Sequence, residues 1–219
     1  MNVMPELAAL EQERRSKRNP EIQAIMDEAG DEVAALDIEH KALRSGDKAP
    51  SFTLPNATGQ SVSLESLLAN GPAVIVFYRG GWCPYCSVAL RVLQARLDDI
   101  QAQNATLLAI SPEQPDYSLS TTEKLSLEFE VLSDTGNQIA RRFGLVFTLP
   151  ESLRPIYSRS GYDIIAHNGD ASFELPVPGT FVVGTDGVIA LAHVDSNYTR
   201  RLSPDAIIAA LKELQSAPA

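Results

Sequence analysis

The sequence predicts an α/β fold, in which a central mixed sheet is flanked by helices. The first sign is a β-α-β unit: a buried strand over residues 73–78, a helix over 84–103 and a buried strand over 106–110. Strands joined in this way lie parallel, with a right-handed crossover. The second sign is a β-hairpin, because Thr185-Asp186-Gly187 separates the apolar runs 181–183 and 188–194.

The composition is that of one large globular domain. The chain has 219 residues, of which 44% are hydrophobic, and a net charge of −10. This negative charge argues against nucleic acid as a partner, because nucleic-acid binding needs clustered Lys and Arg. The one basic cluster, formed by Arg14, Arg15, Lys17 and Arg18, is interpreted as the solvated face of a helix.

No segment is predicted to target the chain or to cross a membrane. Residues 1–18 carry Glu6, Glu11 and Glu13 and lack the apolar core of a signal peptide. No apolar run approaches the roughly 18 residues of a membrane span. The only two cysteines lie three positions apart and cannot staple distant segments, so we expect a cytoplasmic protein with a redox-active pair.

Residues 1–45 are predicted to form a helical extension, and residues 46–219 the main domain. Apolar residues recur at helical spacing within 5–43, with a helix start at Asn19-Pro20 and a second break expected at Gly30. This segment holds no cysteine and no aromatic residue. Two roles stay open for it: packing against the main domain, or forming a homodimer contact.

The remaining elements follow from local patterns. Residues 51–54 and 61–63 are predicted to pair as a hairpin, after which Ser63 caps a helix that runs through Leu68. Further helices are expected over 115–127 and 137–143, with a short strand over 130–132 between them. Residues 145–178 are less regular, and the last helix starts at Ser203-Pro204.

The chemistry of the chain is predicted to lie in the segment Trp82-Cys83-Pro84-Tyr85-Cys86. Its cysteines have the C-x-x-C spacing of a thiol–disulfide couple, and they sit between a buried strand and a helix. Unpaired N–H groups and the helix dipole stabilise a thiolate at a helix start. Such a thiolate is a nucleophile toward disulfides or peroxides. Arg79 is the best candidate for a cation that lowers the thiol pKa, and Trp82 is expected to shield the pair.

Two alternatives to this interpretation are a zinc site and a pair of buried structural cysteines. A zinc site needs two more ligands, and His40, His167 and His193 are scattered without paired spacing. Two buried structural cysteines are the second alternative. The aromatic residue before the pair, the Pro-Tyr between them and the strand–helix context favour the redox interpretation, with no metal and no cofactor.

The order of elements resembles the thioredoxin fold. A second mark of the resemblance is Val177-Pro178-Gly179-Thr180-Phe181, at the start of the hairpin. In thioredoxin-like proteins a cis-proline opens this strand and faces the cysteines. The resemblance therefore implies that the Val177–Pro178 bond is cis and that Pro178 and Thr180 support the site. Pro-Tyr between the cysteines is similar to the dipeptide of glutaredoxins.

A narrower resemblance is carried by three segments. These are Lys48-Ala49-Pro50-Ser51-Phe52-Thr53-Leu54, then Val76-Phe77-Tyr78-Arg79-Gly80, and then Phe181 to Ile189. They resemble the alkyl hydroperoxide reductase / thiol-specific antioxidant (AhpC/TSA) family, over about residues 46–215. The segment Arg79 to Cys86, with Asp195 and Tyr198-Thr199-Arg200-Arg201, is similar to its peroxiredoxin-like branch that carries C-x-x-C.

The chain departs from the family pattern at the site. Peroxiredoxins place Pro-x-x-x-Thr-x-x-Cys after the Phe-Tyr of the strand, which puts the peroxidatic cysteine at Cys86. The family threonine then falls on Cys83, the family proline on Arg79 and the family's second arginine on Pro178. Of the four family residues, this chain keeps only the cysteine, Cys86. It has in addition a second thiol, Cys83, and a proline, Pro178, and both are similar to residues of thioredoxin-like proteins.

Three functions are carried forward. The first is an antioxidant thiol oxidoreductase that reduces peroxides with Cys83 and Cys86 and is recycled by thioredoxin or glutathione. The second is a disulfide reductase with little peroxidase activity, and the third is a non-enzymatic redox sensor or binding protein. We expect Cys83, at the exposed end of the helix, to attack disulfides and Cys86 to resolve. The family alignment keeps Cys86 open as the thiol that attacks a peroxide.

Overall fold

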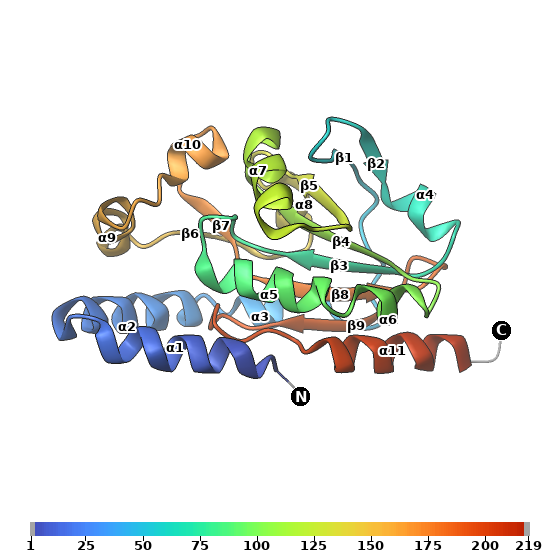
Figure 1. Cartoon of the computed structure of the whole chain (residues 1–219), viewed down its shortest axis with the longest axis horizontal. Coiled ribbons are helices and arrows are strands. Elements are labelled where there is room, and N and C mark those ends of the chain that lie inside the picture. The colour runs from blue at the N-terminus through green and yellow to red at the C-terminus, as the bar shows by residue number, and fades with distance from the viewer. Residues whose placement is uncertain (1–2, 217–219) are drawn as a thin grey trace.

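The structure, a computed structural model, describes residues 3–216 and confirms the α/β prediction. Five strands form a mixed sheet in the order β5-β4-β3-β8-β9 (Figure 1). Strand β3 (Ala73–Phe77) pairs in parallel with β4 (Thr106–Ser111), which pairs in parallel with β5 (Glu130–Ser133). On its other side β3 pairs antiparallel with β8 (Gly179–Val183), which forms the predicted hairpin with β9 (Ile189–Val194).

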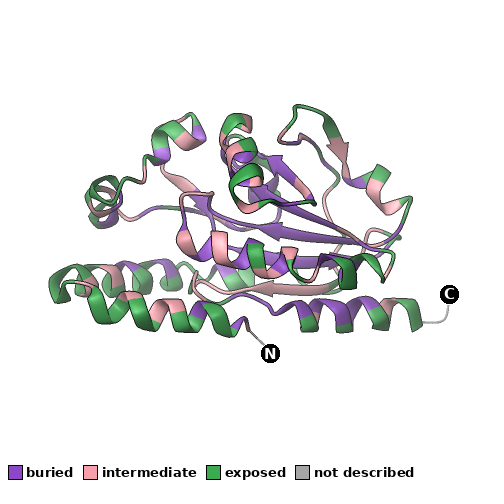
Figure 2. Ribbon diagram, viewed as in Figure 1, coloured by how far each residue is buried: buried purple, intermediate pink, exposed green. Residues whose placement is uncertain are grey.

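The central strands are apolar on both faces because helices cover both. In β3, Val74 and Val76 face one hydrophobic cluster, whereas Ile75 and Phe77 face the other. This alternation follows from the period of two in a strand. Every residue of β3 is buried, which Figure 2 shows as continuous purple on the strand. The helix faces that point away from the sheet are exposed.

Helices and short strands complete the domain. Strands β1 (Thr53–Pro55) and β2 (Ser61–Ser63) form the predicted hairpin, and Ser63 Oγ accepts from Ser66 N at the start of the next helix. The helices are α1 (Pro5–Lys17), α2 (Pro20–Ala35), α3 (Ile38–Lys41), α4 (Leu64–Leu68), α5 (Pro84–Gln94), α6 (Leu97–Gln101), α7 (Pro115–Leu125), α8 (Gln138–Arg142), α9 (Arg154–Arg159), α10 (Ile164–Asn168) and α11 (Pro204–Ser216).

The helix predicted over 84–103 is two helices. The backbone leaves the helical conformation at Arg96, between α5 and α6. Leu93, Leu97 and Ile100 are buried on both sides of this break. Because their spacing is the same with or without the break, periodicity could not reveal it. The side chain of Arg96 pairs with Asp99 and with Asp205 of α11.

The N-terminal extension is a helical hairpin, in which α2 folds back along α1 (Figure 1). The predicted start at Asn19 is confirmed, since its Oδ1 accepts from Glu21 N at 2.7 Å. The predicted break at Gly30 is wrong, because α2 passes through it; one glycine costs a helix only about 1 kcal/mol. The helix ends instead before Asp37, which has a left-handed backbone. The extension packs on the main domain through Leu7, Ala29 and Val33.

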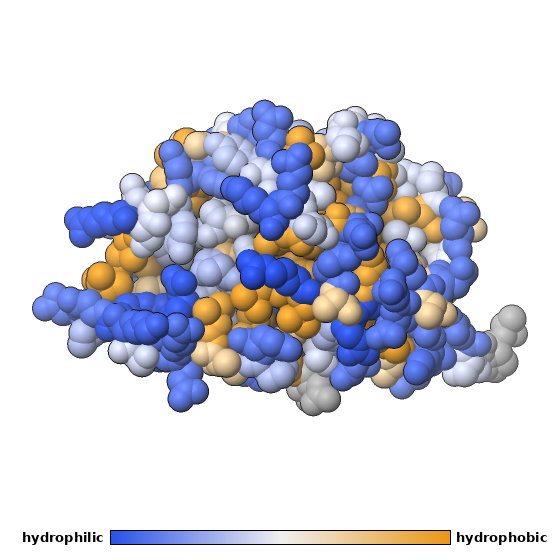
Figure 3. All heavy atoms as spheres, viewed as in Figure 1, coloured by the Kyte–Doolittle hydropathy of each residue, from blue (hydrophilic) through white to orange (hydrophobic). Residues whose placement is uncertain are grey.

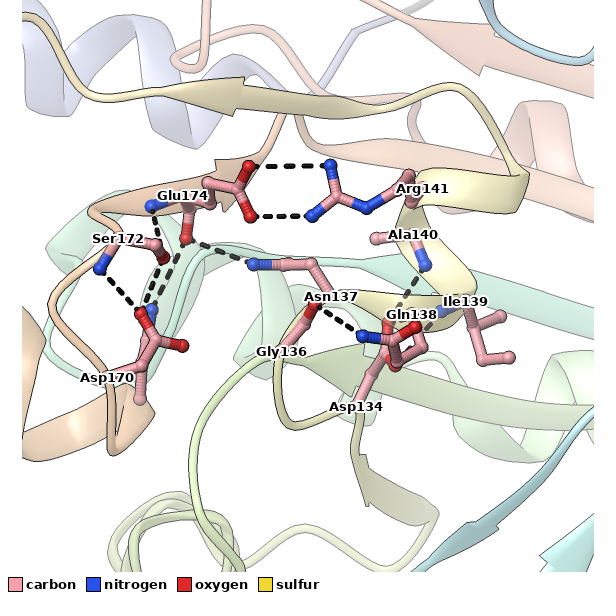
Figure 4. Close-up of polar contacts among 11 residues, drawn as sticks. Asp134, Gly136, Asn137, Gln138, Ile139, Ala140, Arg141, Asp170, Ser172 and Glu174 are labelled. Atoms are coloured by element: carbon pink, nitrogen blue, oxygen red, sulfur yellow. Dashed lines mark hydrogen bonds and ion pairs between the residues drawn. The ribbon is translucent and has the colours of Figure 1, made fainter.

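The segment between α8 and β8 is an irregular insertion with short elements. It contains β6 (Val146–Thr148), a 3-10 turn η1 (Glu151–Leu153), α9, α10 and β7 (Glu174–Pro176). Polar contacts tie it to the main domain (Figure 4). Asn137 donates to the carbonyl of Glu174, whose carboxylate pairs with Arg141 at 2.6 Å. Asp134 accepts from the N–H groups of Ile139 and Ala140, although burial raises its pKa. The insertion is therefore held against α8, which follows the carboxyl end of β5.

Within residues 3–216, no helix is long and apolar enough to cross a membrane. The division of the chain at residue 45 stays a prediction.

Candidate active site

The two cysteines lie where β3 leads into α5. Cys83 is the N-cap residue of α5, Pro84 is its first residue, and Cys86 belongs to its first turn. Proline suits this position because the first helical N–H has no partner in any case. Both cysteines are free thiols, and their exposed fractions are 0% for Cys83 and 1% for Cys86. The predicted placement at a helix start is confirmed, but neither thiol reaches the surface.

The loop before Cys83 is tightly packed, and two glycines make this possible. Gly80 has φ +147°, and a Cβ there would lie 2.3 Å from Trp82 Nε1. A Cβ on Gly81 would lie 2.0 Å from Thr121 Oγ1. Both distances are far below van der Waals contact, so any side chain would displace the loop.

A buried carboxylate fixes the same loop from the neighbouring strand. Glu113 follows β4, is 0% exposed, and accepts the N–H of Gly81 at 2.8 Å. Its other oxygen lies 2.6 Å from Nδ1 of His167, which belongs to α10 of the insertion. Glu113 thus joins the loop before Cys83 to the insertion. Sequence reasoning missed this residue, although a signal exists: Glu113 follows a parallel neighbour of β3, and the carboxyl ends of parallel strands meet at one edge.

Arg79 makes direct contact with Cys83. Its Nη2 donates to Cys83 Sγ at 3.2 Å, and its Nη1 donates to Tyr157 Oη at 3.1 Å. The guanidinium lies 4.1 Å from the ring centroid of Tyr198 and 5.2 Å from that of Trp82. Arg79 is 4% exposed, so this charge sits in a cage of aromatic rings. Such contacts stabilise a desolvated cation without neutralising it.

A second arginine faces Cys86. The Nη2 atom of Arg201, in the loop before α11, lies 3.9 Å from Cys86 Sγ, and Arg201 is 4% exposed. The sequence by itself predicts no role for Arg200 or Arg201. The two adjacent arginines differ in their surroundings: Arg201 is buried, whereas Arg200 is exposed and pairs with Asp195 at 3.1 Å. No local pattern distinguishes two adjacent arginines after a strand.

The two thiols are perturbed in opposite directions. Burial acts to raise the pKa of Cys83, but hydrogen bonds from Cys86 and the charge and hydrogen bond of Arg79 together hold it well below its ordinary value. Burial raises the pKa of Cys86 well above its ordinary value, and the hydrogen bond and charge of Cys83 add to this effect. The geometry therefore favours a thiolate on Cys83 and a thiol on Cys86.

Trp82 and Tyr85 screen the pair. The Trp82 ring packs against Tyr157 and Tyr162 of the insertion, with centroid distances of 5.7 and 5.5 Å. Tyr85 is 3% exposed, packs edge-on against Tyr198, and donates its hydroxyl to Glu11 of α1. The aromatic side chains at the site thus meet both the insertion and the N-terminal extension.

The prediction of a cis Val177–Pro178 bond is wrong. All peptide bonds of the described residues are trans. The physical reason is that β7 runs on into β8 as extended chain, with Val177 N donating to Leu145 O at 2.8 Å. A residue before a trans proline prefers this extended conformation. Pro178 nevertheless lines a cavity together with Arg79 and Tyr198. Thr180 is buried in β8, opposite Val76.

Within residues 3–216, no group of three or more His, Cys, Asp or Glu side chains is arranged to hold a metal ion. The chemistry that the described site offers is that of two thiols, one polarised as a thiolate, beside two buried guanidinium groups.

Comparison with known proteins shows a family to which the sequence of the chain is similar. Residues 45–192 match the sequence model of the AhpC/TSA family. The peroxiredoxin Bcp of Escherichia coli (strain K12) is 34% identical over 104 residues, which are 47% of this chain and 65% of that protein. The match thus spans less than two thirds of that relative. A putative peroxiredoxin of Mycobacterium tuberculosis (strain H37Rv) is 29% identical over 158 residues, covering 72% of this chain and 88% of that one.

Solved structures show the same fold. The crystal structure of peroxidoxin BcpB from Mycobacterium tuberculosis superposes with a TM-score of 0.62 at 22% identity, covering 81% of this chain and 99% of that one. A putative thiol:disulfide interchange protein DsbE from Chlorobium tepidum superposes with a TM-score of 0.53 at 20% identity, covering 80% and 96%.

Proposed function

The chain belongs to the AhpC/TSA family, and we propose that it is a thiol-dependent peroxidase that works through Cys83 and Cys86. The observation that carries the proposal is the 3.2 Å contact between Arg79 Nη2 and Cys83 Sγ in a buried site. A cation at this distance favours the thiolate, and the thiolate is the form that attacks peroxides. Relatives named as peroxiredoxins support the substrate class.

The reaction follows in two steps. The Cys83 thiolate attacks one peroxide oxygen, the O–O bond breaks, and the leaving oxygen departs as water or an alcohol after taking a proton. Cys83 is then a sulfenic acid. Cys86 then gives up its proton and attacks this sulfur, so that the S–O bond breaks, the Cys83–Cys86 disulfide forms, and the hydroxyl group leaves with that proton as water. The high pKa of Cys86 keeps it protonated until Cys83 has lost its negative charge.

Arg79 has a further group available for the substrate. Its Nε is buried and has no hydrogen-bond partner among the described residues, whereas both of its terminal nitrogens are engaged. In families that carry them, the threonine and the second arginine hold the peroxide, and this chain lacks both. The unpaired Nε–H of Arg79 is the donor that takes over this role.

The disulfide is returned to two thiols by a reductant, for which thioredoxin and glutathione are the candidates. This cycle needs a reducing compartment such as the cytoplasm. A homodimer stays a prediction; the outer face of α2 exposes Ile22 and Ile25, and sedimentation of the full chain tests it.

The test is the reaction of the reduced protein with hydrogen peroxide in a stopped-flow instrument. Trp82, the only tryptophan of the chain, is next to Cys83 and reports its oxidation by fluorescence. We expect oxidation far faster than that of free cysteine, with one peroxide consumed per disulfide formed. A protein that reacts no faster than free cysteine, but reduces a disulfide substrate with turnover, is a disulfide reductase, and the peroxidase proposal is then wrong.

A further inference from the structure

The basic cluster near the N-terminus reaches the active site. A cavity of about 40 Å³ lies between the α1–α2 hairpin and the start of α5, and three guanidinium groups line it: Arg14, Arg18 and Arg79. Trp82 and Pro84, the neighbours of Cys83 on either side, line it as well. The remaining lining is mostly aromatic. We call this cavity the arginine mouth.

The four basic residues of the cluster divide into two pairs. Arg15 forms an ion pair with Asp27, and Lys17 lies 2.6 Å from Glu13, both on the exposed side of the hairpin. In Figure 3 the tip of the α1–α2 hairpin, at the lower left, carries mostly hydrophilic side chains. The predicted solvated face is therefore confirmed for this pair.

The other pair points inward. Arg14 and Arg18 are partly buried, and neither has a carboxylate within ion-pair distance among the described residues. The Arg14 guanidinium lies 5.9 Å from the ring centroid of Tyr85. Glu11 of the same helix accepts the Tyr85 hydroxyl and lies 3.9 Å from Arg15. Two cations in the arginine mouth thus lack an anionic partner.

Oxidation of the cysteines leaves a third cation without a partner. In the reduced protein Cys83 Sγ lies 3.2 Å from Arg79 Nη2, so a thiolate on Cys83 would be the counter-charge of Arg79. A Cys83–Cys86 disulfide is neutral, so the charge of Arg79 is then uncompensated in a buried site. Unpaired buried charges are costly, and an anion that enters relieves this cost. The arginine mouth is therefore most attractive to anions in the state that waits for a reductant.

The surroundings restrict the size of that reductant. Cys83 is fully buried, and the aromatic side chains next to it are held by the insertion, through Tyr157 and Tyr162, and by α1, through Glu11. A protein that brings its own cysteine to Cys83 would have to displace these contacts. A small molecule needs only the side chains around the arginine mouth to move.

We propose that the arginine mouth binds the carboxylate of a small anionic thiol, which reduces the Cys83–Cys86 disulfide. This inference rests on the proposed function, in which that disulfide forms. The thiolate of the small molecule attacks Cys83 Sγ, the Cys83–Cys86 bond breaks, and Cys86 leaves as a thiolate that takes a proton. A second thiol attacks the mixed disulfide, which releases the small disulfide and the Cys83 thiolate.

The test compares three thiols that differ in charge. Protein oxidised with a disulfide-forming reagent is mixed with 3-mercaptopropionate, 2-mercaptoethanol or cysteamine, and Trp82 fluorescence reports reduction. The variants are Arg14→Gln and Arg18→Gln, and the matched controls on the same hairpin are Arg15→Gln and Lys17→Gln. Each variant's rate is divided by the wild-type rate for the same thiol, so the intrinsic reactivity of the thiol cancels.

We expect Arg14→Gln and Arg18→Gln each to slow the anionic thiol by about three- to tenfold, to leave the neutral thiol within about twofold, and to accelerate the cationic thiol. The control variants should change all three rates by less than about twofold. Added salt should shrink the difference for the anionic thiol, because it screens the attraction. Equal effects on all three thiols, or equal effects of the control variants, would overturn the proposal.

A second arm separates the reductant from the peroxide as the anionic molecule. Reduced wild type and both inward variants react with a fatty-acid hydroperoxide and with its methyl ester. A charge preference in this arm alone assigns the arginine mouth to the peroxide and overturns the proposal. If the wild type consumes no peroxide at all, the proposed function is wrong. The experiment with the three thiols still measures, independently of peroxide, how the rate of disulfide reduction depends on the charge of the thiol.

Discussion

The surroundings of Cys83 and of Cys86 look alike at first sight, yet they shift the two thiols in opposite directions. Both sulfurs are buried at the start of one helix, and each faces a buried arginine. Arg79 donates to Cys83 at 3.2 Å, and Cys86 adds a second donor. Cys86 has Arg201 at 3.9 Å and the negative charge of Cys83 beside it. Burial penalises both thiolates, so direct hydrogen bonds decide which one forms.

The largest expected difference between the two cysteines appears when one of them is replaced by serine. Cys83→Ser should abolish peroxide consumption, because the remaining thiol stays buried, and burial is the largest cause of its raised pKa. Cys86→Ser should still be oxidised once and should trap a mixed disulfide on Cys83 when a thiol reductant is present. Intact-mass measurement after each reaction checks both. If Cys83→Ser traps the reductant and Cys86→Ser traps none, the roles are reversed, as the family alignment allows.

The second expected effect is on pH dependence. The Cys83 thiolate should persist well below the ordinary pKa of a thiol, and Cys86 should deprotonate only above it. Peroxide reactivity should therefore hold through neutral pH and fall as pH drops through the lowered pKa of Cys83, tenfold for each unit below it. Thiolate absorbance in the ultraviolet, followed during a titration, checks this. A single step involving both thiols near the ordinary value would contradict it.

The third expected effect is a difference between Arg79 and Arg201 in how much each supports oxidation of Cys83. Arg79→Gln removes the charge in contact with Cys83 and should raise its pKa, slowing oxidation at neutral pH by about ten- to hundredfold. Arg201→Gln is the matched control, with an expected slowing of less than about threefold, because its longer contact is with Cys86. The measurement is stopped-flow oxidation of both variants together with titration of the thiolate. Recovery of the Arg79→Gln rate at high pH would show that the loss came from the pKa.

The smallest effect concerns the hydrogen bond that orients Arg79. Tyr157→Phe keeps the ring but removes the oxygen that accepts from Arg79 Nη1. We expect oxidation to slow by about two- to fivefold, which corresponds to roughly 0.5–1 kcal/mol. Tyr162→Phe is the control, since its ring packs on Trp82 without contacting Arg79 by a hydrogen bond. Equal rates for both variants would mean that the aromatic cage alone holds the guanidinium.

Much of the site could be predicted because it is local. Cys83, Cys86 and Arg79 lie within eight consecutive residues, and the strand before them and the helix after them show in the apolar pattern. Short-range rules of strand alternation and helix capping are sufficient there. The cis bond at Pro178 was inferred from resemblance instead, and the extended path from β7 into β8 overrode it.

Taken by itself, the sequence determined the β-α-β unit, the hairpin after it and the placement of two thiols at a helix start. The tertiary structure alone decided which residues from distant parts of the chain surround those thiols. Arg201, Tyr157 and Glu113 come from a loop, the insertion and a neighbouring strand, and Arg14 from the extension. Their patterns in the chain are those of ordinary polar residues. Whether such a side chain points to solvent or to a sulfur depends on contacts between residues far apart in the sequence. The free energies of burying and pairing its charge take effect only when the chain has folded and those contacts exist.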